Sequence, residues 1–375
     1  MFQCRLCNSD IGSNSIIRLG PFPRAAQYYP LPGEFDSDLG VELDIHQCPM
    51  CGLVQLSNAP VHYFREVITA ATLSESAKRA RLFEIRGLVD RFELVGAKSI
   101  DIGSGKGEMV GVLQEAGLDA TGIEFSQESV NLARLNGYNS LCGYIQDATI
   151  LEKYRFFICL NYLEHQPDIK TFIRAIHNIT DDEGIGYVTV PNLSYLLETG
   201  CLYEFVADHL VYFTSRTLTS AFEGNGFDVL SCELVNNAND IAIVVKKKKT
   251  LYLHGDWNHV KKLSISLKNT IAQIRDSGSK VAVWGAGHRT LALLAISEID
   301  NIEFIVDSAK FKQDRFAPIT HIKIVSPSVF EASAVGVVIV MVPGIYPDEV
   351  IKTIKQFGRH VRILVLKNNA IEEIE

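Results

Sequence analysis

The sequence predicts an α/β protein built in three parts. Two glycine-rich turns, at residues 103–107 and 285–287, each follow a short apolar stretch and precede a helical pattern. This order of strand, turn and helix is how a Rossmann-like unit begins. Two Cys-x-x-Cys pairs lie in an N-terminal stretch rich in Pro, Gly and aromatic residues. We therefore expect a metal-binding lobe at 1–62, a Rossmann-like core at 63–248 and a second Rossmann-like domain at 249–375.

The length and composition indicate a folded protein that has no general affinity for polyanions. The chain has 375 residues, of which 47% are hydrophobic and 21% are charged. Thirty-six Lys and Arg against 44 Asp and Glu give a net charge of −8, which argues against a nucleic acid polymer or an anionic membrane as partner. The sequence has neither an apolar run of membrane-spanning length nor the pattern of a secretory signal. We expect a cytoplasmic protein that is a monomer or a small homo-oligomer.

The N-terminal cysteines are the first functional feature. Four of the eight cysteines form the two pairs, Cys4 with Cys7 and Cys48 with Cys51. Two such tight turns bring four thiolates to one ion, in the tetrahedral arrangement of structural zinc sites. We therefore expect one structural zinc ion, with four separately packed thiols as the alternative. His46 would be a fifth ligand to a shell that four cysteines already fill.

A helical pattern over residues 73–95 leads into the first glycine-rich turn. A short apolar strand, 98–102, precedes the glycines at 103–107, and a helix follows them. Glycines let a ligand approach the backbone, and a helix N-terminus offers unpaired N–H groups. The next strand, 120–125, contains Glu124 near its end, and a carboxylate there accepts both hydroxyl groups of a ribose. The pattern therefore predicts a nucleoside-type ligand.

Asp101 discriminates between two nucleoside cofactors that share this spacing. A dinucleotide site usually has the pattern Gly-x-Gly-x-x-Gly, with a pyrophosphate over the helix. A carboxylate just before the first glycine would repel that pyrophosphate, whereas it attracts the ammonium and sulfonium groups of S-adenosylmethionine. The residues therefore favour S-adenosylmethionine over NAD.

The run Asp101-Ile102-Gly103-Ser104-Gly105-Lys106-Gly107, with Glu124, resembles motif one and the ribose-binding acid of class I S-adenosylmethionine-dependent methyltransferases. The order of the three parts resembles the bacterial zinc-containing sugar C-methyltransferase family, which methylates C3 of nucleotide-linked 4-keto-deoxysugars. This resemblance spans essentially the whole chain. It implies a class I methyltransferase core, S-adenosylmethionine and one structural zinc as cofactors, and a nucleotide-linked sugar as substrate.

The strands that follow supply the remaining expected donor contacts. Residues 146–148 fit the acidic loop after the third strand, where the adenine amino group is met. Residues 156–160 are predicted to form the fourth strand, and ligands of open α/β sheets bind at the carboxyl ends of the strands. Residues 186–192 and 241–245 are expected to be later strands of the core. The expected donor-binding residues are Asp101, Gly103, Ser104, Gly105, Glu124, Phe125, Asp147, Ala148 and Asn161.

The resemblance also implies a histidine base. The family carries Tyr-x-Glu-His where this chain has Val206-Ala207-Asp208-His209. His209 is the expected base for the proton beside the sugar ketone, because imidazole has a pKa near neutrality and an adjacent acid can orient it. Asp208 is expected to hold the ring of His209. His165, after the fourth strand, matches a second functional histidine beside the donor.

The absence of the family's tyrosine leaves methylation of oxygen as an alternative. Val206 cannot donate a hydrogen bond to a ketone or an enolate, so Tyr203 or Tyr212 would have to do so from another direction. Tyr63 lies near the position of a further family tyrosine. The first alternative is an O-methyltransferase acting on a similar sugar, which needs no enolate. The second is a non-catalytic nucleotide-sugar-binding protein, against which the intact glycine turn argues.

The last third of the chain predicts a second α/β unit. Lys246–Lys249 is expected to be a solvated linker. Beyond it, residues 280–289 repeat the strand, the Gly-Ala-Gly turn and the helix, and the strand 302–307 ends in an acid. Taken alone, this pattern would predict an NAD site. The His288-Arg289 pair directly after the glycines favours a Rossmann-like fold without redox function, and the resemblance implies that this domain completes the active-site cleft.

Overall fold

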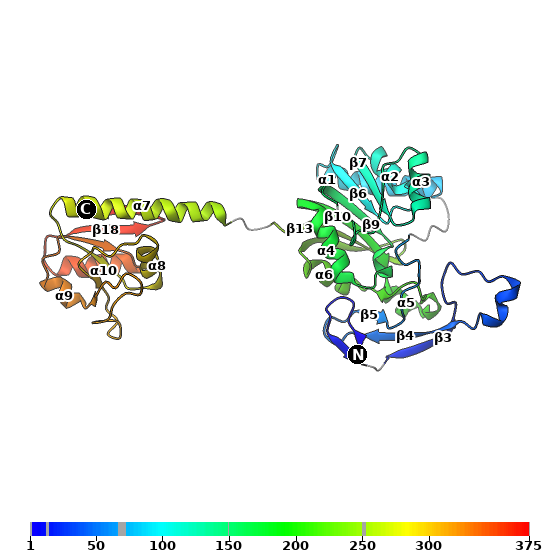
Figure 1. The fold of residues 1–375 in the computed structure, drawn as a ribbon, viewed down its shortest axis with the longest axis horizontal. Helices are drawn as coiled ribbons and strands as arrows, with labels where there is room; N and C mark the ends of the chain where they lie inside the picture. The colour runs from blue at the N-terminus through cyan, green and yellow to red at the C-terminus, as the bar shows by residue number, and fades with distance from the viewer. Residues whose placement is uncertain (1, 13–14, 67–72, 149, 250–252, 375) are drawn as a thin grey trace. The chain divides into compact units, whose positions relative to one another are not determined.

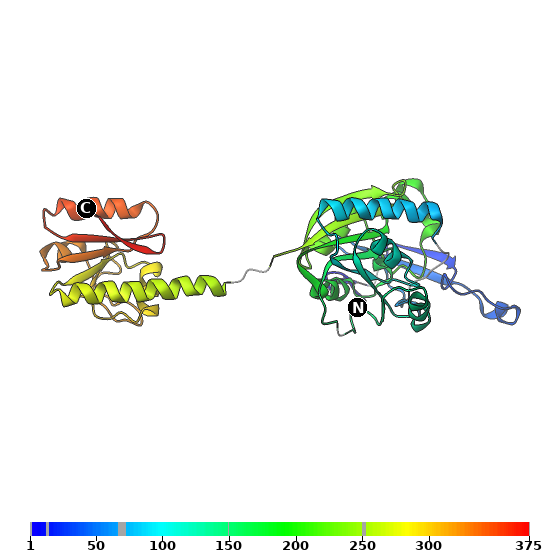
Figure 2. The same cartoon turned by 90° about the horizontal axis from the view of Figure 1, so that it is seen from above.

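The computed structural model divides the chain into two compact units, Met1–Thr250 and Leu251–Glu375. The structure describes residues 2–12, 15–66, 73–148, 150–249 and 253–374. Helices lie against a mainly parallel sheet in each unit, which confirms the predicted α/β class (Figures 1 and 2). The domain boundaries expected at residues 62 and 248 stay predictions. Every helix among the described residues is too short or too polar to cross a membrane.

A seven-stranded sheet forms the centre of the first unit, with the strand order β12-β13-β10-β9-β6-β7-β8. The strands β8, β7, β6, β9 and β10 are parallel, and β13 is antiparallel to both of its neighbours. The strands are β6 Lys98–Ile102, β7 Asp119–Glu124, β8 Ser140–Cys142, β9 Tyr154–Leu160, β10 Thr180–Pro191, β12 Phe227–Val235 and β13 Asp240–Lys247. The chain starts in the middle at β6, runs out to β8 and returns to β9. The carboxyl ends of β6 and β9 therefore form a topological switch point, where open α/β sheets bind their ligands.

Helices cover both faces of this sheet because alternate residues of its strands are apolar on each side. In β9, Phe156 and Ile158 pack against α1 and α2, whereas Phe157 and Cys159 pack on the side of α4 and α6. The helix predicted at 73–95 is α1, which begins after Ser74, whose hydroxyl caps it. The helices of this unit are α1 Glu75–Arg91, α2 Glu108–Glu115, α3 Gln127–Leu135, α4 Ile169–Ile179, α5 Leu193–Thr199 and α6 Ser215–Glu223, with short 3-10 turns at η2 Leu163–His165 and η3 Leu202–Glu204.

The N-terminal lobe has a sheet of its own, and its last strand comes from a distant part of the chain. Its order is β11-β5-β4-β3, formed by β3 Ile17–Phe22, β4 Val41–Gln47, β5 Val54–Leu56 and β11 Val211–Tyr212. A second, two-stranded sheet joins β1 Phe2–Gln3 and β2 Asp10–Gly12. Val211 pairs with Gln55 and Tyr212 with Val54, in antiparallel register. The lobe therefore holds the chain immediately after His209.

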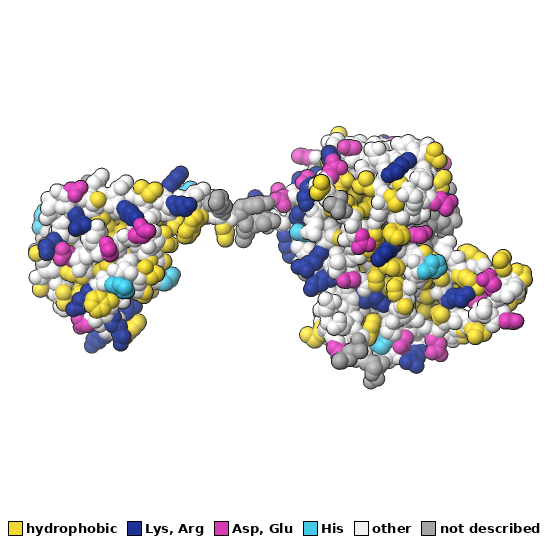
Figure 3. Space-filling model, viewed as in Figure 1, with side chains coloured by type: hydrophobic (Ala, Val, Ile, Leu, Met, Phe, Trp, Pro, Cys, Tyr) yellow, Lys and Arg dark blue, Asp and Glu magenta, His cyan; other side chains and the backbone are white. Residues whose placement is uncertain are grey.

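The connection between β3 and β4 projects from the rest of this unit as an arm (Figure 1). It contains the 3-10 turn η1 Pro32–Ser37 and exposes the side chains of Tyr29, Leu31, Phe35 and Leu39, which belong to its apolar surface (Figure 3). The base of the arm contacts the core, because the Ala26 N–H donates a hydrogen bond of 2.7 Å to the Asp208 carboxylate. The arm thus contributes to the surroundings of the predicted catalytic segment.

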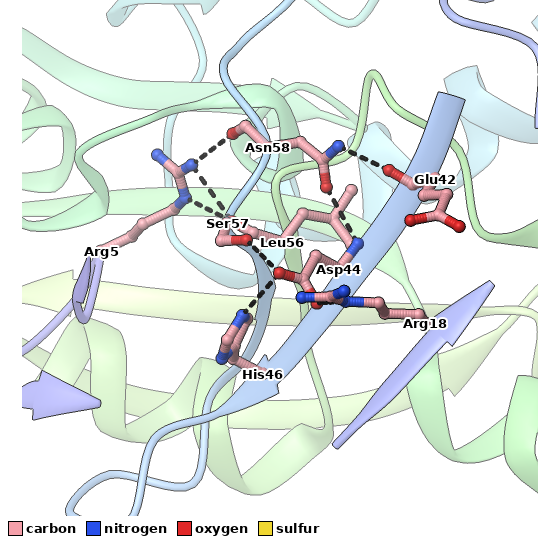
Figure 4. A network of polar contacts seen from close by, with 8 residues as sticks. All are labelled: Arg5, Arg18, Glu42, Asp44, His46, Leu56, Ser57 and Asn58. Carbon is pink, nitrogen blue, oxygen red and sulfur yellow. Dashed lines mark hydrogen bonds and ion pairs between the residues drawn. The ribbon is translucent and has the colours of Figure 1, made fainter. Parts of the chain in front are cut away.

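Arg5, inside the first cysteine pair, fastens the lobe to the core. Its guanidinium donates to the carbonyl oxygens of Leu56 and Asn58 in the lobe and of Pro167 in the core, at 2.9 to 3.3 Å (the lobe contacts are drawn in Figure 4). The Arg5 carbonyl in turn accepts the N–H of Ile169, the first residue of α4, at 2.9 Å. The first cysteine pair and the start of α4 are therefore one continuous hydrogen-bonded structure.

The second unit is a smaller Rossmann-like domain. Its six-stranded sheet has the order β16-β15-β14-β17-β18-β19, and only β19 is antiparallel to its neighbour. The strands are β14 Val281–Trp284, β15 Ile305–Val306, β16 Ile324–Val325, β17 Val337–Val340, β18 Arg362–Lys367 and β19 Ala370–Ile374, and the helices are α7 His254–Asp276, α8 His288–Ile296, α9 Pro327–Ala332 and α10 Tyr346–Gln356. The predicted strands and glycine turn of this unit are present.

The lysine run forms the predicted solvated linker only in part, because Lys248 and Lys249 follow β13 and are exposed whereas the first two lysines are not. Lys246 and Lys247 belong to β13, and the Lys247 ammonium donates to the Thr180 carbonyl at 2.7 Å while only 8% of the residue is exposed. The four-carbon stem of a lysine packs along apolar surface while its head finds a carbonyl or an acid. A strand therefore accommodates these lysines. The closing strand is accordingly longer than the predicted 241–245, and its antiparallel neighbour β12 was not predicted.

Candidate functional site

The predicted donor-binding residues converge at the carboxyl edge of β6, β7, β8 and β9. The turn after β6 takes left-handed backbone angles at Gly103, Gly105 and Gly107, with φ of 79°, 51° and 84°, which side chains other than glycine rarely adopt. Glu124, at the end of β7, is 1% exposed and accepts the Gly105 N–H at 3.1 Å and the Ser126 N–H at 2.8 Å. The glycine turn and the predicted ribose acid are therefore in direct contact.

The electrostatics of this edge favour a cation. Asp101 is buried, and burial together with the neighbouring Glu124 raises the pKa of its carboxyl group well above the usual range. Ser104 is also buried, and its hydroxyl has no hydrogen-bond partner in the described part of the chain. A buried polar atom without a partner is one that a ligand can satisfy. The residues fit an S-adenosylmethionine whose amino-acid end lies at the turn.

The structure places Arg65, which the sequence analysis did not single out, beside two of the predicted donor residues. Its guanidinium carbon lies 5.5 Å from the ring centre of Phe125 and 5.2 Å from that of Tyr144, and its Nη2 lies 3.9 Å from the Asp147 carboxylate. Phe125 and Asp147 are the residues expected beside the adenine. Arg65 was missed because it comes from the segment before α1, far from motif one in the sequence. Ala148 lies in the same turn as Asp147, after β8.

Asn161 stands directly after β9, in a left-handed conformation with φ of 47°. Its side-chain carbonyl accepts the Thr189 hydroxyl at 2.6 Å, and its amide nitrogen lies 3.4 Å from an Asp240 carboxylate oxygen. These contacts tie the end of β9 to β10 and β13. Asn161 therefore shapes the switch point, whether or not it also contacts the donor.

The two predicted histidines lie together. The ring centres of His165 and His209 are 4.8 Å apart, with the rings nearly perpendicular at 82°. The Nδ1 of His165 lies 2.9 Å from the backbone carbonyl of Asp208, so Nδ1 carries the hydrogen and Nε2 is left as an acceptor. The Leu210 N–H donates to the Glu164 carbonyl at 2.9 Å. Two backbone-anchored contacts thus hold the η2 turn against the segment that carries His209.

Asp208 does not hold the ring of His209 as expected. Its carboxylate accepts the Tyr63 hydroxyl and the Ala26 N–H, each at 2.7 Å. Asp208 lies within a turn that is closed by a hydrogen bond from the His209 N–H to the Val206 carbonyl. The side chains of Asp208 and His209 therefore contact different residues. The Tyr63 hydroxyl also accepts the Gln27 N–H at 2.9 Å. Asp208 is therefore the point where the arm, Tyr63 and the segment that carries His209 meet.

Neither tyrosine considered as a substitute for the family phenol is free to act as one. The buried Tyr212 hydroxyl is bound to the backbone N–H and carbonyl of Val206, at 2.9 and 3.2 Å. Tyr203 lies on the surface, with 73% of the residue exposed. The phenol that joins the Asp208 segment is instead that of Tyr63.

A cavity of about 480 Å³ opens beside these groups. Tyr28, His62 and Tyr63 line it from the lobe and the connecting segment, and Lys106 and Ser126 line it from the donor edge. A wider hollow, of about 700 Å³, lies where β8 and β9 begin, at the amino ends of these strands. Open α/β sheets bind their ligands at the opposite, carboxyl ends. The smaller cavity joins the donor turn to the Tyr63–Asp208 pair.

The four N-terminal cysteines form the expected cluster. All four Sγ atoms lie within 4.8 Å of one another. The Leu6 N–H points to the Cys4 sulfur at 3.4 Å and the Cys51 N–H to the Cys48 sulfur at 3.5 Å, as donors that stabilise thiolates. The cluster fits a tetrahedral zinc.

His46 lies apart from the cluster's hydrogen-bond pattern. It is buried, with Nε2 within ion-pair distance, 3.5 Å, of the Asp44 carboxylate, and that carboxylate accepts hydrogen bonds from Arg18 and Ser57 (Figure 4). Its two ring nitrogens have no hydrogen-bond partner among the described residues. The set of four ligand atoms that meet in the lobe contains cysteine sulfurs alone.

Comparison with known proteins identifies the family. C-methyltransferase NovU of Streptomyces niveus is 23% identical over 370 residues, covering 87% of this chain and 86% of that protein. A family model described as a methyltransferase domain matches residues 76–232, and one described as a C-methyltransferase C-terminal domain matches residues 247–366. The chain is an S-adenosylmethionine-dependent methyltransferase, and its similarity to NovU and to the C-terminal domain model supports the C-methyltransferase family. S-adenosylmethionine is thus the methyl donor of this C-methyltransferase, and the resemblance drawn from the sequence is confirmed.

Three further similar proteins each match less than half of this chain. The ubiquinone biosynthesis O-methyltransferase of Bordetella avium is 32% identical over 90 residues, 22% of this chain and 37% of that protein. Among solved structures, a Clostridium acetobutylicum S-adenosylmethionine-dependent methyltransferase covers 47% of this chain and 93% of its own, at 13% identity and a TM-score of 0.39. Magnesium protoporphyrin IX methyltransferase of Synechocystis, solved with bound SAH, covers 48% and 90%, at 15% identity and a TM-score of 0.39.

In the second Rossmann-like unit, the acid that follows β15 is Asp307, and it has an ion-pair partner in addition to its backbone donors. The Asp307 carboxylate accepts the Ala286 and Ala309 N–H groups, each at 2.8 Å, and forms a 3.0 Å ion pair with Lys312. Glu124 accepts two backbone N–H groups in the same way. The added lysine charge at Asp307 competes with the hydroxyl groups of a ribose. This contact agrees with a Rossmann-like unit that has no redox function.

Replacing Tyr63 by phenylalanine in the C-methyltransferase should destabilise the fold. The change leaves the buried Asp208 carboxylate with one fewer donor, which typically costs about 1 to 3 kcal/mol of unfolding free energy. Denaturant unfolding of the variant measures this loss. Tyr203→Phe, which removes an exposed hydroxyl, is the matched control and should unfold like the parent. Equal stability of the two variants would show that the Tyr63 hydroxyl contributes nothing to the fold.

Proposed function

We propose that the chain methylates a carbon beside the ketone of a nucleotide-linked 4-keto-deoxysugar. The observation that carries this proposal is the meeting of His165 and His209, because His165 follows β9 at the carboxyl edge of the sheet that also carries the glycine turn and Glu124. A cavity lies between that edge and Tyr63. A C–H bond beside a ketone is acidic enough for a side-chain base to remove its proton when the resulting enolate is stabilised. A cytoplasmic nucleotide sugar is the substrate class that the family resemblance implies.

His209 takes the proton in this proposal, and the carbon left with the electron pair attacks the donor. S-adenosylmethionine, when bound, supplies an electrophilic methyl group. His165 is fixed by the Asp208 carbonyl and presents Nε2 as an acceptor beside His209. Asp208 acts through Tyr63, by holding its hydroxyl in place at the cavity. This assigns Asp208 a positioning role different from the one expected from the sequence.

The donor is proposed to lie with its amino-acid end at Gly103–Gly107 and its ribose on Glu124. Replacing Glu124 by alanine should weaken donor binding roughly ten- to a hundredfold, because hydrogen bonds to a charged group are worth about 1.5 to 3 kcal/mol. Calorimetry with S-adenosylmethionine measures the change, and Glu115→Ala, at the end of α2, is the matched control. Undiminished affinity in the Glu124 variant would place the donor elsewhere. NAD binding by the second unit would instead revive an oxidoreductase.

The zinc is proposed to be structural and to be held by Cys4, Cys7, Cys48 and Cys51. Four thiolates close the tetrahedral shell, so a bound ion has no open position for water or substrate.

Incubation with a panel of nucleotide sugars and S-adenosylmethionine, followed by NMR of the product, tests the proposed methylation reaction. A methyl group on a ring carbon beside the ketone is the expected result. A methyl group on oxygen would favour the O-methyltransferase that the loss of the tyrosine at Val206 allows.

A further inference from the structure

His209 as the structure places it is a weak base. Burial, with a smaller effect from His165, lowers the pKa of His209 to about 3. A general base works best when its pKa lies near the operating pH. The proposed reaction therefore needs a group that stabilises the imidazolium of His209. The Asp208 carboxylate is committed to Tyr63 and Ala26 and does not supply it.

Glu164 is the carboxyl group that stands beside the histidines. One ligand atom from each of Glu164, His165 and His209 lies within 4.8 Å of the others. Glu164 is 2% exposed, and its Oε2 has no hydrogen-bond partner in the described part of the chain. It forms no ion pair with lysine or arginine among the described residues. Its own carbonyl accepts the N–H of Leu210, so Glu164 and the His209 segment are held at a set distance.

We propose that Glu164 is the positioning residue that makes His209 a usable base, because its carboxylate is the partner of the imidazolium formed during proton removal. The inference rests on the proposed function. The C–H bond of the substrate breaks, its proton goes to His209 and its electron pair stays on the carbon as the enolate. Glu164 gains and loses no bond in this step. An ionised carboxylate near an imidazole strengthens the imidazole as a base.

The charge state of Glu164 sets a pH dependence. Burial, with a further effect of the Asp240 charge, raises the pKa of Glu164 to about 8, so the group ionises as the pH rises from 7 to 9. The other titratable groups that face this pair are His165, Cys159, Tyr212, Asp208 and Asp240. Burial lowers the pKa of His165 and raises those of Cys159 and Tyr212, so these three do not ionise in that interval. Proton removal should therefore become about tenfold faster between pH 7 and pH 9.

The test is deuterium exchange into a nucleoside diphosphate-linked 4-keto-deoxysugar in heavy water without S-adenosylmethionine, followed by NMR from pH 7 to pH 9. Glu164→Gln keeps the size and polarity of the side chain but removes its charge. Its exchange rate at pH 9 should be roughly ten- to a hundredfold below that of the parent, with no rise between pH 7 and 9. Glu204→Gln, an exposed acid in η3, is the matched control and should keep the rise.

The outcomes separate this inference from the proposed function. A parent protein without exchange at any pH would overturn the proposed reaction, and the inference with it. A parent that exchanges, with a Glu164→Gln variant of the same rate and pH profile, would overturn the role of Glu164 alone. The role of Glu164 would also be overturned if the parent bound a second metal ion per chain and the Glu164→Gln variant did not. Glu164, His165 and His209 would then be ligands of a cation. The variant should unfold no more easily than the parent at pH 9, since it carries no buried charge there.

Discussion

Replacing Cys48 by serine should remove the zinc and abolish methyl transfer in the same variant. A structural zinc contributes an apparent binding free energy of about 10 to 16 kcal/mol, and the whole net stability of a domain is about 5 to 15 kcal/mol. Loss of one thiolate therefore unfolds the lobe around the cluster. The measurements are zinc content by mass spectrometry, expected to fall from one equivalent to a small fraction, together with turnover and thermal unfolding.

The effect should reach the active site because the lobe and the site share structure. Cys4, Leu6, Cys48 and Leu53 belong to the same apolar core as Leu163 and the inner face of α4. Arg5 joins that core to Pro167 and Ile169, a few residues after His165, and β5 pairs with β11 just after His209. Donor binding at Glu124 should be the least affected function, since β6 and β7 lie in the seven-stranded sheet.

Cys232→Ser is the matched control for the zinc prediction. Cys232 is a single, partly buried cysteine in β12, outside the cluster. The control should keep one zinc per chain and full turnover. A Cys48→Ser protein with unaltered unfolding and turnover would show that the four cysteines are separately packed thiols rather than a metal site.

The local motifs of this chain could be predicted because neighbouring residues build them. The turn at Gly103–Gly107 and the acid at Glu124 are consecutive parts of one strand-turn-helix-strand unit, and each cysteine pair is one tight turn. For the lysine run at 246–249, the predicted linker was wrong at Lys246 and Lys247, which belong to β13. The charge pattern of the run is local, but the burial of Lys247 depends on the carbonyl of Thr180, which only the paired strands bring near.

The arrangement around the catalytic segment depends on contacts between distant residues, and no short pattern encodes them. The strand β11 has two residues and pairs with β5, which lies more than a hundred positions earlier. The hydrogen bonds from Tyr63 and Ala26 to Asp208 also join residues that lie far apart in the sequence. The place of Glu164 beside His209 is another such case, since the hydrogen bond between the Glu164 carbonyl and the Leu210 N–H joins their two segments. The sequence therefore predicted the two histidines that the structure brings together, but it did not predict that the Asp208 carboxylate binds Tyr63 and Ala26.

Replacing His209 by alanine should reduce methyl transfer by about 10² to 10⁴, the usual contribution of general-base catalysis. Methyl transfer to carbon first requires a nucleophile, and His209 is the proposed base that creates it. The imidazole of His209 packs against that of His165, whereas the Glu124 carboxylate is bound to the Gly105 N–H of the glycine turn. Affinity for S-adenosylmethionine, measured by calorimetry, should therefore stay nearly unchanged while turnover collapses. His360→Ala, an exposed histidine before β18, is the matched control and should retain activity.

Exchange of the substrate proton distinguishes the carbon mechanism from methylation of oxygen. In heavy water the parent should place deuterium on the carbon beside the ketone without any methyl donor, because His209 removes and returns that proton. The His209→Ala variant should lose this exchange together with turnover, since the same step limits both. An O-methyltransferase needs no enolate, so the parent would then show no exchange. Turnover could still fall in the His209→Ala variant of such an enzyme. Turnover lost in the variant while exchange persists would show that another group is the base and that His209 acts only after the enolate has formed.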